Sequence, residues 1–356
     1  MNWLEEITPR HIQELVPYAS ARREAVSGEV WLNANENPYE CIAPEGISSL
    51  NRYPGFQPET LIRGYSSYAG VESDQVLVTR GIDEGIDLLT RAFCEPGEDS
   101  IIYTPPTYGM YKISAATNNI SANAVLLRAD WSLDVQGIIE VAPQCKLIYL
   151  CSPNNPTGSL LDPADIRSIL DAGSEKTLVI VDEAYIEFKP ESSVVKLLSE
   201  YSNLVVMRTL SKAFGLAGLR CGFLLASPEI IDVLQKVSAP YPIPVPVVDI
   251  ANEALSEKGI TCMMRDVETL NKDREKLMDT LGTLSFVKKT YISSANFILF
   301  QVEDALSLMS FLMDRGVVIR NQSSQLALDN TLRVTVGTEV EIEKLYQCLK
   351  AYEVHK

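Results

Sequence analysis

Short apolar runs alternate with longer segments of helical periodicity through the first two thirds of the chain. The runs are rich in Val, Ile and Leu, as is typical of strands that are buried on both faces of a sheet. They cover residues 76–78, 101–103, 147–150, 178–181, 204–207 and 221–225. Strands that alternate with helices form a mostly parallel sheet with helices on both faces. This pattern predicts an α/β domain.

After Pro246 the pattern changes to that of a mixed α+β domain. A long charged stretch with helical periodicity comes first, and strand-like and helical segments follow it. In chain order we expect a helix through 266–281, a strand at 295–302, a helix near 305–315, strands near 317–320 and 332–336, and a last helix at 339–352. The segment before residue 45 has no regular pattern. A smaller second domain is therefore expected after the α/β domain.

Length and charge narrow the class of protein. A chain of 356 residues with 46% hydrophobic content can fill about two domains. Its net charge of −16 argues against nucleic acid or an anionic membrane as a partner. No stretch approaches the ~18 to 20 consecutive apolar residues of a membrane span. The start, Met1 to Glu6, does not read as a signal peptide, and the seven scattered cysteines fit reduced thiols, so we expect a cytoplasmic protein.

Histidine is scarce, which excludes several kinds of catalysis. The chain has two, His11 and His355, each close to an end. This argues against a Ser-His-Asp or Cys-His hydrolase and against a histidine-rich metal site, so no metal is expected. No Gly-x-Gly-x-x-Gly fingerprint follows a predicted strand, which weakens a nicotinamide-dependent alternative. Proton transfer must fall to another group, such as a lysine whose pKa is lowered.

The segment from Thr209 to Arg220 is the most informative feature. Lys212 lies there between small and polar residues, just after the apolar run 204–207. Such a lysine is well placed to form a Schiff base with an aldehyde cofactor, and pyridoxal phosphate (PLP) is the obvious candidate. Ser211 could donate a hydrogen bond to the cofactor phosphate, and Arg220 supplies a fixed positive charge. The alternative is an ordinary lysine in a surface loop.

Polar residues also follow the two preceding apolar runs. Asn155 lies in a Cys-Ser-Pro-Asn-Asn-Pro-Thr-Gly segment, and Asp182 ends the next run, three positions before Tyr185. Ligands of open α/β sheets bind at the carboxyl ends of parallel strands. Asp182 can pair there with a protonated pyridine nitrogen, while Asn155 and Tyr185 can hydrogen-bond the phenolic oxygen of the ring. Turn chemistry and a helix cap are the simpler alternatives, but the order of the motifs favours a cofactor site.

A helix is predicted to open at Gly81 and to run to about Phe93. The N-terminus of a helix binds phosphate through its free backbone N–H groups and its dipole. A simple helix cap explains the same residues, and periodicity alone does not separate the two interpretations.

Together these motifs resemble the fold-type-I PLP-dependent aminotransferases of class II, and among them the histidinol-phosphate aminotransferases. The Thr-Leu-Ser-Lys and Asn-Asn-Pro-Thr-Gly elements are typical of the whole superfamily. The Asn-Ala-Asn-Glu and Pro-Thr-Tyr-Gly-Met-Tyr elements are typical of the narrower group. Ile82 stands where that group usually has a small residue, but the contact there is through the backbone. Further segments that carry the resemblance are residues 32–36, 51–54, 80–84, 105–111 and 332–337.

The resemblance implies how the cofactor is held. It implies a large PLP-binding domain over 46–250 and a discontinuous small domain made of 1–45 and 251–356. It assigns the cofactor phosphate to Gly81, Ile82 and Asp83, and places Tyr108 on the pyridine ring. Tyr53 would reach the phosphate in the neighbouring subunit, which implies a homodimer with shared active sites.

The resemblance also implies that arginines bind the substrate. By resemblance, Arg333 lies nearest the substrate anion, Arg320 is a second anion ligand, Asn155 also contacts the substrate, and Tyr18 closes the pocket. The implied reaction converts L-histidinol phosphate and 2-oxoglutarate to imidazole-acetol phosphate and L-glutamate, in histidine biosynthesis. The same arginines would therefore meet a phosphate and a carboxylate in alternate half-reactions.

In the implied mechanism Lys212 moves a proton, Asp182 keeps the ring nitrogen protonated and Tyr185 assists them. Two rival enzymes share these motifs, an aromatic-amino-acid aminotransferase and a threonine-phosphate decarboxylase. A rival of another class is a catalytically silent PLP-binding or regulatory protein, which the intact set of Lys212, Asp182 and Asn155 argues against.

Overall fold

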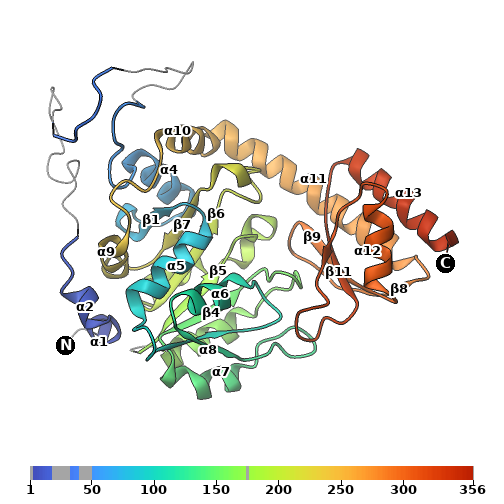
Figure 1. The fold of residues 1–356 in the computed structure, drawn as a ribbon, viewed down its shortest axis with the longest axis horizontal. Helices are drawn as coiled ribbons and strands as arrows, with labels where there is room; N and C mark the ends of the chain where they lie inside the picture. The colour runs from blue at the N-terminus through green and yellow to red at the C-terminus, as the bar shows by residue number, and fades with distance from the viewer. Residues whose placement is uncertain (1–2, 18–32, 40–49, 174–175, 356) are drawn as a thin grey trace.

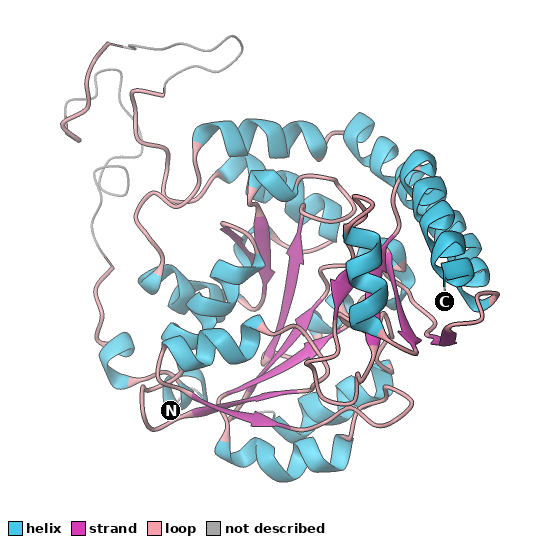
Figure 2. Ribbon diagram, turned by 45° about the vertical axis from the view of Figure 1, so that its right-hand side comes forward, coloured by secondary structure: helices cyan, strands magenta, loops and turns pink. Residues whose placement is uncertain are grey.

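The computed structural model describes residues 3–17, 33–39, 50–173 and 176–355. Two sheets of different size organise these residues, and helices cover them (Figure 1; Figure 2). No helix within these ranges is long and apolar enough to cross a membrane. The α/β domain followed by a smaller α+β unit is confirmed.

The large sheet has seven strands in the order β1-β7-β6-β5-β4-β2-β3. The strands β2 to β6 run parallel to their neighbours among themselves, whereas β7 is antiparallel to both β1 and β6. The predicted mostly parallel sheet is therefore correct. The strands are β1 (Val76–Thr79), β2 (Ser100–Tyr103), β3 (Ser121–Ala124), β4 (Leu147–Cys151), β5 (Leu178–Asp182), β6 (Leu204–Thr209) and β7 (Gly222–Leu225).

Both faces of this sheet are covered, which explains why its central strands are apolar without interruption. In β5, Leu178 and Ile180 face one core and Val179 and Val181 face the other, as the two-residue period of a strand requires. The first core includes residues of α5 (Ile82–Phe93), α6 (Met110–Thr117) and α9 (Pro228–Val237). The second includes residues of α4 (Glu59–Ala69), α7 (Val135–Val141), α8 (Pro163–Gly173) and α10 (Val245–Ala254).

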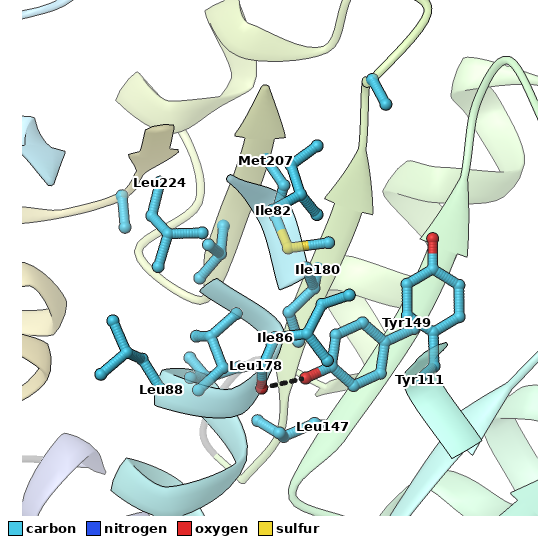
Figure 3. Close-up of a cluster of buried hydrophobic side chains, with 14 of the residues drawn as sticks. Ile82, Ile86, Leu88, Tyr111, Leu147, Tyr149, Leu178, Ile180, Met207 and Leu224 are labelled. Atoms are coloured by element: carbon cyan, nitrogen blue, oxygen red, sulfur yellow. Dashed lines mark hydrogen bonds between the residues drawn. The ribbon is translucent and has the colours of Figure 1, made fainter. Parts of the chain in front are cut away.

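Figure 3 shows the first core, where side chains of α5 lie against the central strands. Tyr149 of β4 donates a hydrogen bond to the backbone oxygen of Ile86 at 3.4 Å. The ring of Tyr149 also stacks on Tyr111 of α6, with ring centroids 4.8 Å apart. These contacts fix α5 and α6 against the sheet near the carboxyl ends of its strands.

The small sheet is antiparallel, in the order β10-β11-β9-β8. Its strands are β8 (Val287–Thr290), β9 (Phe297–Val302), β10 (Arg320–Asn321) and β11 (Thr331–Thr335), and α12 (Ala305–Met313) and α13 (Glu339–His355) share its core. The long helix α11 (Glu257–Gly282) joins the two parts: Met263 and Val267 lie in the large-sheet core, and Leu277 and Leu281 lie in the small-sheet core. The side chain of Ser256 caps its start by accepting a hydrogen bond from the backbone of Gly259 at 3.1 Å.

The N-terminal helices α1 (Trp3–Ile7) and α2 (Arg10–Gln13) pack on the large sheet. Leu4 and Ile7 are buried in its first core, and Lys236 of α9 donates a hydrogen bond to the backbone oxygen of Gln13 at 2.9 Å. The apolar side chains of α1 thus find an apolar partner beside α9. The assignment of residues 1–45 to the small domain stays a prediction. The domain boundaries at 46 and 250 stay a prediction.

Candidate active site

A cavity of about 210 Å³ opens where β4, β5 and β6 end, beside the start of α5. Most of the site residues that the sequence predicts meet there, although they come from segments far apart in the chain. This is the carboxyl edge of the parallel strands, where ligands of such sheets bind. The lining residues are Ile82, Asp83, Tyr108, Cys151, Asn155, Asp182, Ala184, Tyr185, Thr209, Ser211, Lys212, Arg220 and Arg333.

Lys212 reaches the cavity from the turn after β6. Its ammonium nitrogen lies 5.4 Å from the centroid of the Tyr185 ring. Partial burial and then the positive charge of Arg333 lower the pKa of Lys212, whereas the carboxylates of Asp182 and Asp83 oppose that shift. A lysine with a lowered pKa serves as a nucleophile or a base more readily than an ordinary one.

Asp182 ends β5 and is 3% exposed. Its carboxylate accepts a hydrogen bond from the Tyr111 hydroxyl at 2.6 Å and one from the backbone N–H of Ala184 at 3.0 Å. Burial raises the pKa of Asp182 to about 6, while these two hydrogen bonds and the nearby Lys212 favour its charged form. Such a carboxylate is suited to a cationic partner that enters the cavity.

Asp83 joins two of the predicted residues at the start of α5. Its carboxylate accepts a hydrogen bond from the Tyr108 hydroxyl at 2.8 Å and pairs with the Arg220 guanidinium at 3.3 Å. Gly81 precedes this helix with a φ of 85°, and a Cβ there would lie 2.7 Å from Arg220 Nη2. Only glycine therefore lets the guanidinium come this close to the helix N-terminus, where an anion binds well.

Ser211 lines the same part of the cavity. Its backbone N–H donates a hydrogen bond to the Thr209 hydroxyl oxygen at 3.1 Å, which holds the turn between β6 and Lys212. Its hydroxyl lies 2.9 Å from that of Thr209. Ser211 and Arg220 thus reach the cavity from the two ends of one loop, which connects β6 to β7.

Arg333 reaches the cavity from β11 of the small sheet. Its guanidinium donates a hydrogen bond to the side-chain oxygen of Asn155 and lies 5.1 Å from the centroid of the Phe297 ring. Arg320 stands directly opposite Arg333 across the β10–β11 pair, outside the cavity and exposed to solvent. Burial and the charge of Arg320 lower the pKa of Arg333, so a bound anion would relieve both effects.

Besides Arg320, the predicted residue Tyr53 lies outside the cavity. Tyr53 is half exposed and stacks on Tyr241, with ring centroids 4.4 Å apart, away from the cavity of its own subunit. Tyr18 lies outside the described residues. Tyr53 therefore does not line the cavity described above.

Some residues of the site had not been predicted individually. Cys151, Ala184 and Thr209 line the cavity, and Tyr111 bonds to Asp182. Tyr111 had a usable signal, since it follows the predicted Tyr108 by about one helical turn. Gly158 ends the predicted Asn-Asn-Pro-Thr-Gly segment. Its φ is 74°, and a Cβ there would lie 2.8 Å from the Cα of Ser293, in the segment that leads to β9. The loop after β4 and the segment before β9 therefore touch through their backbones.

We compared the sequence and the fold of this chain with those of known proteins. The family described as "Aminotransferase class I and II" matches residues 27–349. The histidinol-phosphate aminotransferase of Escherichia coli (strain SMS-3-5 / SECEC) is 46% identical over 351 residues, which are 99% of this chain and 99% of that protein.

Two solved structures have the same fold. The histidinol-phosphate aminotransferase from Clostridium acetobutylicum has a TM-score of 0.80 at 25% identity, over 86% of this chain and 92% of that one. The histidinol-phosphate aminotransferase from Sinorhizobium meliloti, solved in complex with pyridoxal-5'-phosphate, has a TM-score of 0.77 at 23% identity, over 85% of this chain and 83% of that one.

Proposed function

Since the chain belongs to the family of class I and II aminotransferases, we propose that it transfers an amino group between L-histidinol phosphate and 2-oxoglutarate, with PLP as its cofactor. The products are imidazole-acetol phosphate and L-glutamate, and the reaction belongs to histidine biosynthesis. One observation carries the proposal: a lysine, a buried aspartate and an arginine from the small sheet line a single cavity. The 46% identity to an E. coli histidinol-phosphate aminotransferase over nearly the whole chain supports the choice of substrate.

The residues of the cavity fit PLP. The start of α5, with Gly81, Arg220 and Ser211 beside it, suits a phosphate group. The buried Asp182 suits a protonated ring nitrogen, because a cation would offset the cost of burying its charge. Lys212 supplies the amine that an aldehyde requires.

Each of these residues has one task in the proposed reaction. Bound PLP supplies an electron-withdrawing ring that stabilises negative charge on the substrate carbon. Lys212 moves the proton to and from that carbon, and its lowered pKa suits this work. Asp182 holds the proton on the ring nitrogen, with Tyr111 fixing its orientation by a 2.6 Å hydrogen bond. Asn155 and Tyr185 orient the ring oxygen, and both line the cavity.

The substrate anion is assigned to Arg333 and Arg320, with Asn155 beside them and Tyr18 closing the pocket. Two arginines that face each other across β10 and β11 repel one another, so a phosphate or a carboxylate between them would be favourable. This explains how one site could accept histidinol phosphate in one half-reaction and glutamate in the other.

A homodimer with shared active sites completes the proposal. The exposed Tyr53–Tyr241 stack supports it, because Tyr53 lies on the surface, where a second subunit can meet it. We also infer a cytoplasmic enzyme with no nucleic-acid partner, in keeping with the net charge of −16.

A panel of amines tests the function. Purified protein with PLP is mixed with histidinol phosphate, histidinol, phenylalanine, tyrosine and threonine phosphate, and the visible absorbance of the cofactor is followed. Histidinol phosphate should convert the cofactor fastest, and 2-oxoglutarate should reverse the change. Preference for phenylalanine or tyrosine would favour an aromatic-amino-acid aminotransferase, and release of carbon dioxide from threonine phosphate would favour the decarboxylase.

A further inference from the structure

A buried ion pair joins β5 and β6 behind the cavity. Arg208 Nε and Nη2 lie 2.9 and 2.8 Å from Glu183 Oε2, and the two side chains are 7% and 1% exposed. Neither residue lines the cavity. The reaction proposed above gives them no task.

The pair lies directly behind the residues that face the cavity. Asp182 is the register partner of Met207, and the backbone N–H of Glu183 donates to the Met207 oxygen at 2.9 Å. Successive side chains of a strand point to opposite faces. Arg208 therefore points away from the face of its neighbour Thr209, which lines the cavity, while Glu183 directly follows Asp182. Each member of the pair is thus adjacent in sequence to a residue of the cavity.

Both carboxylate oxygens of Glu183 accept hydrogen bonds. Glu183 accepts further bonds from the Ser193 hydroxyl at 3.0 Å and from the backbone N–H of Val194 at 2.6 Å. Arg208 also donates to the Ser193 hydroxyl at 2.6 Å. A buried ion pair is often no more stabilising than a well-packed apolar pair, because desolvation offsets the attraction. What this network adds is a fixed geometry between two strand ends.

We propose that Glu183 and Arg208 are positioning residues that set the spacing between Asp182 and Lys212. The pair fixes the end of β5, which carries Asp182, against the end of β6, from which the turn to Lys212 departs. The proposal rests on the proposed function, since it gives those two residues a common ligand, PLP. The proposal requires that replacement of the pair change the spacing between Asp182 and Lys212, even if the free energy of unfolding stays the same.

The test replaces both charges at once. In the double variant Glu183→Leu/Arg208→Met, apolar groups of similar size take the place of the pair, so neither member is left buried without the other. The buried Glu187 then loses the Arg208 charge, which favours its ionised form. Its thermal unfolding should stay close to that of the wild type. Its affinity for PLP, measured by visible absorbance, should fall, and the midpoint of the pH titration of that absorbance should shift. Because a small misplacement of reacting groups is costly, kcat should fall roughly tenfold to hundredfold with little change in the KM for histidinol phosphate.

A matched control uses an ion pair on the surface. Arg167 and Glu200 are half exposed and join α8 to the segment before β6, away from the strand ends. The double variant Arg167→Gln/Glu200→Gln should behave like the wild type in every measurement. If the Leu/Met variant does not fold, the variant Arg208→Lys is tested in its place. This change keeps the positive charge but loses the paired contacts of Nε and Nη2 with Glu183. A folded Leu/Met or Lys variant with wild-type PLP affinity, titration midpoint and kcat would overturn the inference. Failure of the wild type to bind PLP would instead overturn the proposed function.

Discussion

Arg333 of the small sheet donates a hydrogen bond to Asn155 in the loop after β4, 178 positions earlier in the chain. The bond joins the two sheets at the cavity itself. The Phe297 ring contacts both the Arg333 guanidinium and the Tyr185 ring, with separations of 5.1 Å in each case. An anion that draws Arg333 toward itself would therefore also act on Asn155 and Tyr185, the two residues proposed to orient the ring oxygen.

Lys212 should carry the cofactor covalently. Borohydride reduction of the PLP-loaded protein, followed by peptide mass mapping, should place the pyridoxyl group on this residue. Lys212→Ala should abolish transamination, because no other lysine lines the cavity among the described residues. Lys196→Ala, a change at an exposed lysine, is the control and should keep full activity. An adduct on a different lysine would refute the assignment.

Asp182→Asn should impair the reaction much more than the fold. The amide can still accept the hydrogen bond from Tyr111 but cannot balance a protonated ring nitrogen. Loss of one such electrostatic partner typically costs about 3 kcal/mol, or roughly a hundredfold in kcat. Steady-state kinetics and thermal unfolding separate the two effects. Activity within twofold of the wild type would mean that Asp182 serves only to hold the local backbone through Ala184.

Arg320→Ala should raise the KM for histidinol phosphate. Loss of a charge-assisted hydrogen bond of about 1.5 to 3 kcal/mol corresponds to a roughly tenfold to hundredfold weaker interaction. Histidinol, which lacks the phosphate, should be a poor substrate of the wild type and should be little affected by the change. An equal loss for both amines would show that Arg320 supports Arg333 or the strand rather than the phosphate.

Glu187 should make the stability of the protein depend on pH. Its side chain is buried, its Oε2 has no hydrogen-bond partner among the described residues, and burial raises the pKa of its carboxyl to about 7. Because the pKa in the folded state is above that of the unfolded chain, Glu187 destabilises the fold progressively as the pH rises from about 4.5 to about 7. The cost above that range is at most about 3 kcal/mol.

Glu187→Gln removes this dependence. The variant should gain more unfolding free energy relative to the wild type at pH 8 than at pH 5, as measured by denaturant unfolding at both values. A difference that does not change with pH would contradict the prediction. Glu191→Gln, a change at an exposed carboxylate of the same loop, is the control and should show little difference at either pH.

Tyr53 should act in the partner's active site. A mixture of inactive Tyr53→Phe and inactive Lys212→Ala subunits should regain activity as hybrid dimers form, because one of the two sites then has both native residues. Mixing either variant with itself is the control. A fully active monomer in sedimentation experiments would rule out shared sites.

The strands with buried side chains could be predicted from the sequence, whereas β3 and β8 could not. Strands β4, β5 and β6 are buried on both faces, so they appear as uninterrupted apolar runs. Strand β3 reads Ser-Ala-Asn-Ala and β8 reads Val-Lys-Lys-Thr, and both lie at sheet edges with exposed side chains. Their extended form depends on hydrogen bonds to β2 and β9, which no local pattern reports.

The candidate site could likewise be predicted only in part from the sequence. Polar residues that follow buried parallel strands were expected to gather, because those strands end at one edge of the sheet. The bond from Tyr111 to Asp182 spans 71 positions and depends on how α6 packs against β4 and β5. The packing of α1 beside α9 depends likewise on the folded surface, so the association of residues 3–17 with the large sheet could not be derived from their sequence.

The strand order has a consequence for the synthesis of this protein. Within the described chain, β1 pairs with β7 alone, although β2 to β6 are all made between them. Until β7 leaves the ribosome, the edge of β1 that β7 later covers is open, and Arg220 has not yet reached Gly81. Nascent chains that end before β7 should therefore be exposed to association through that edge. The proposed phosphate site at the start of α5 would form only when the last strand of the large sheet is inserted, so uptake of the cofactor would mark the completion of that sheet.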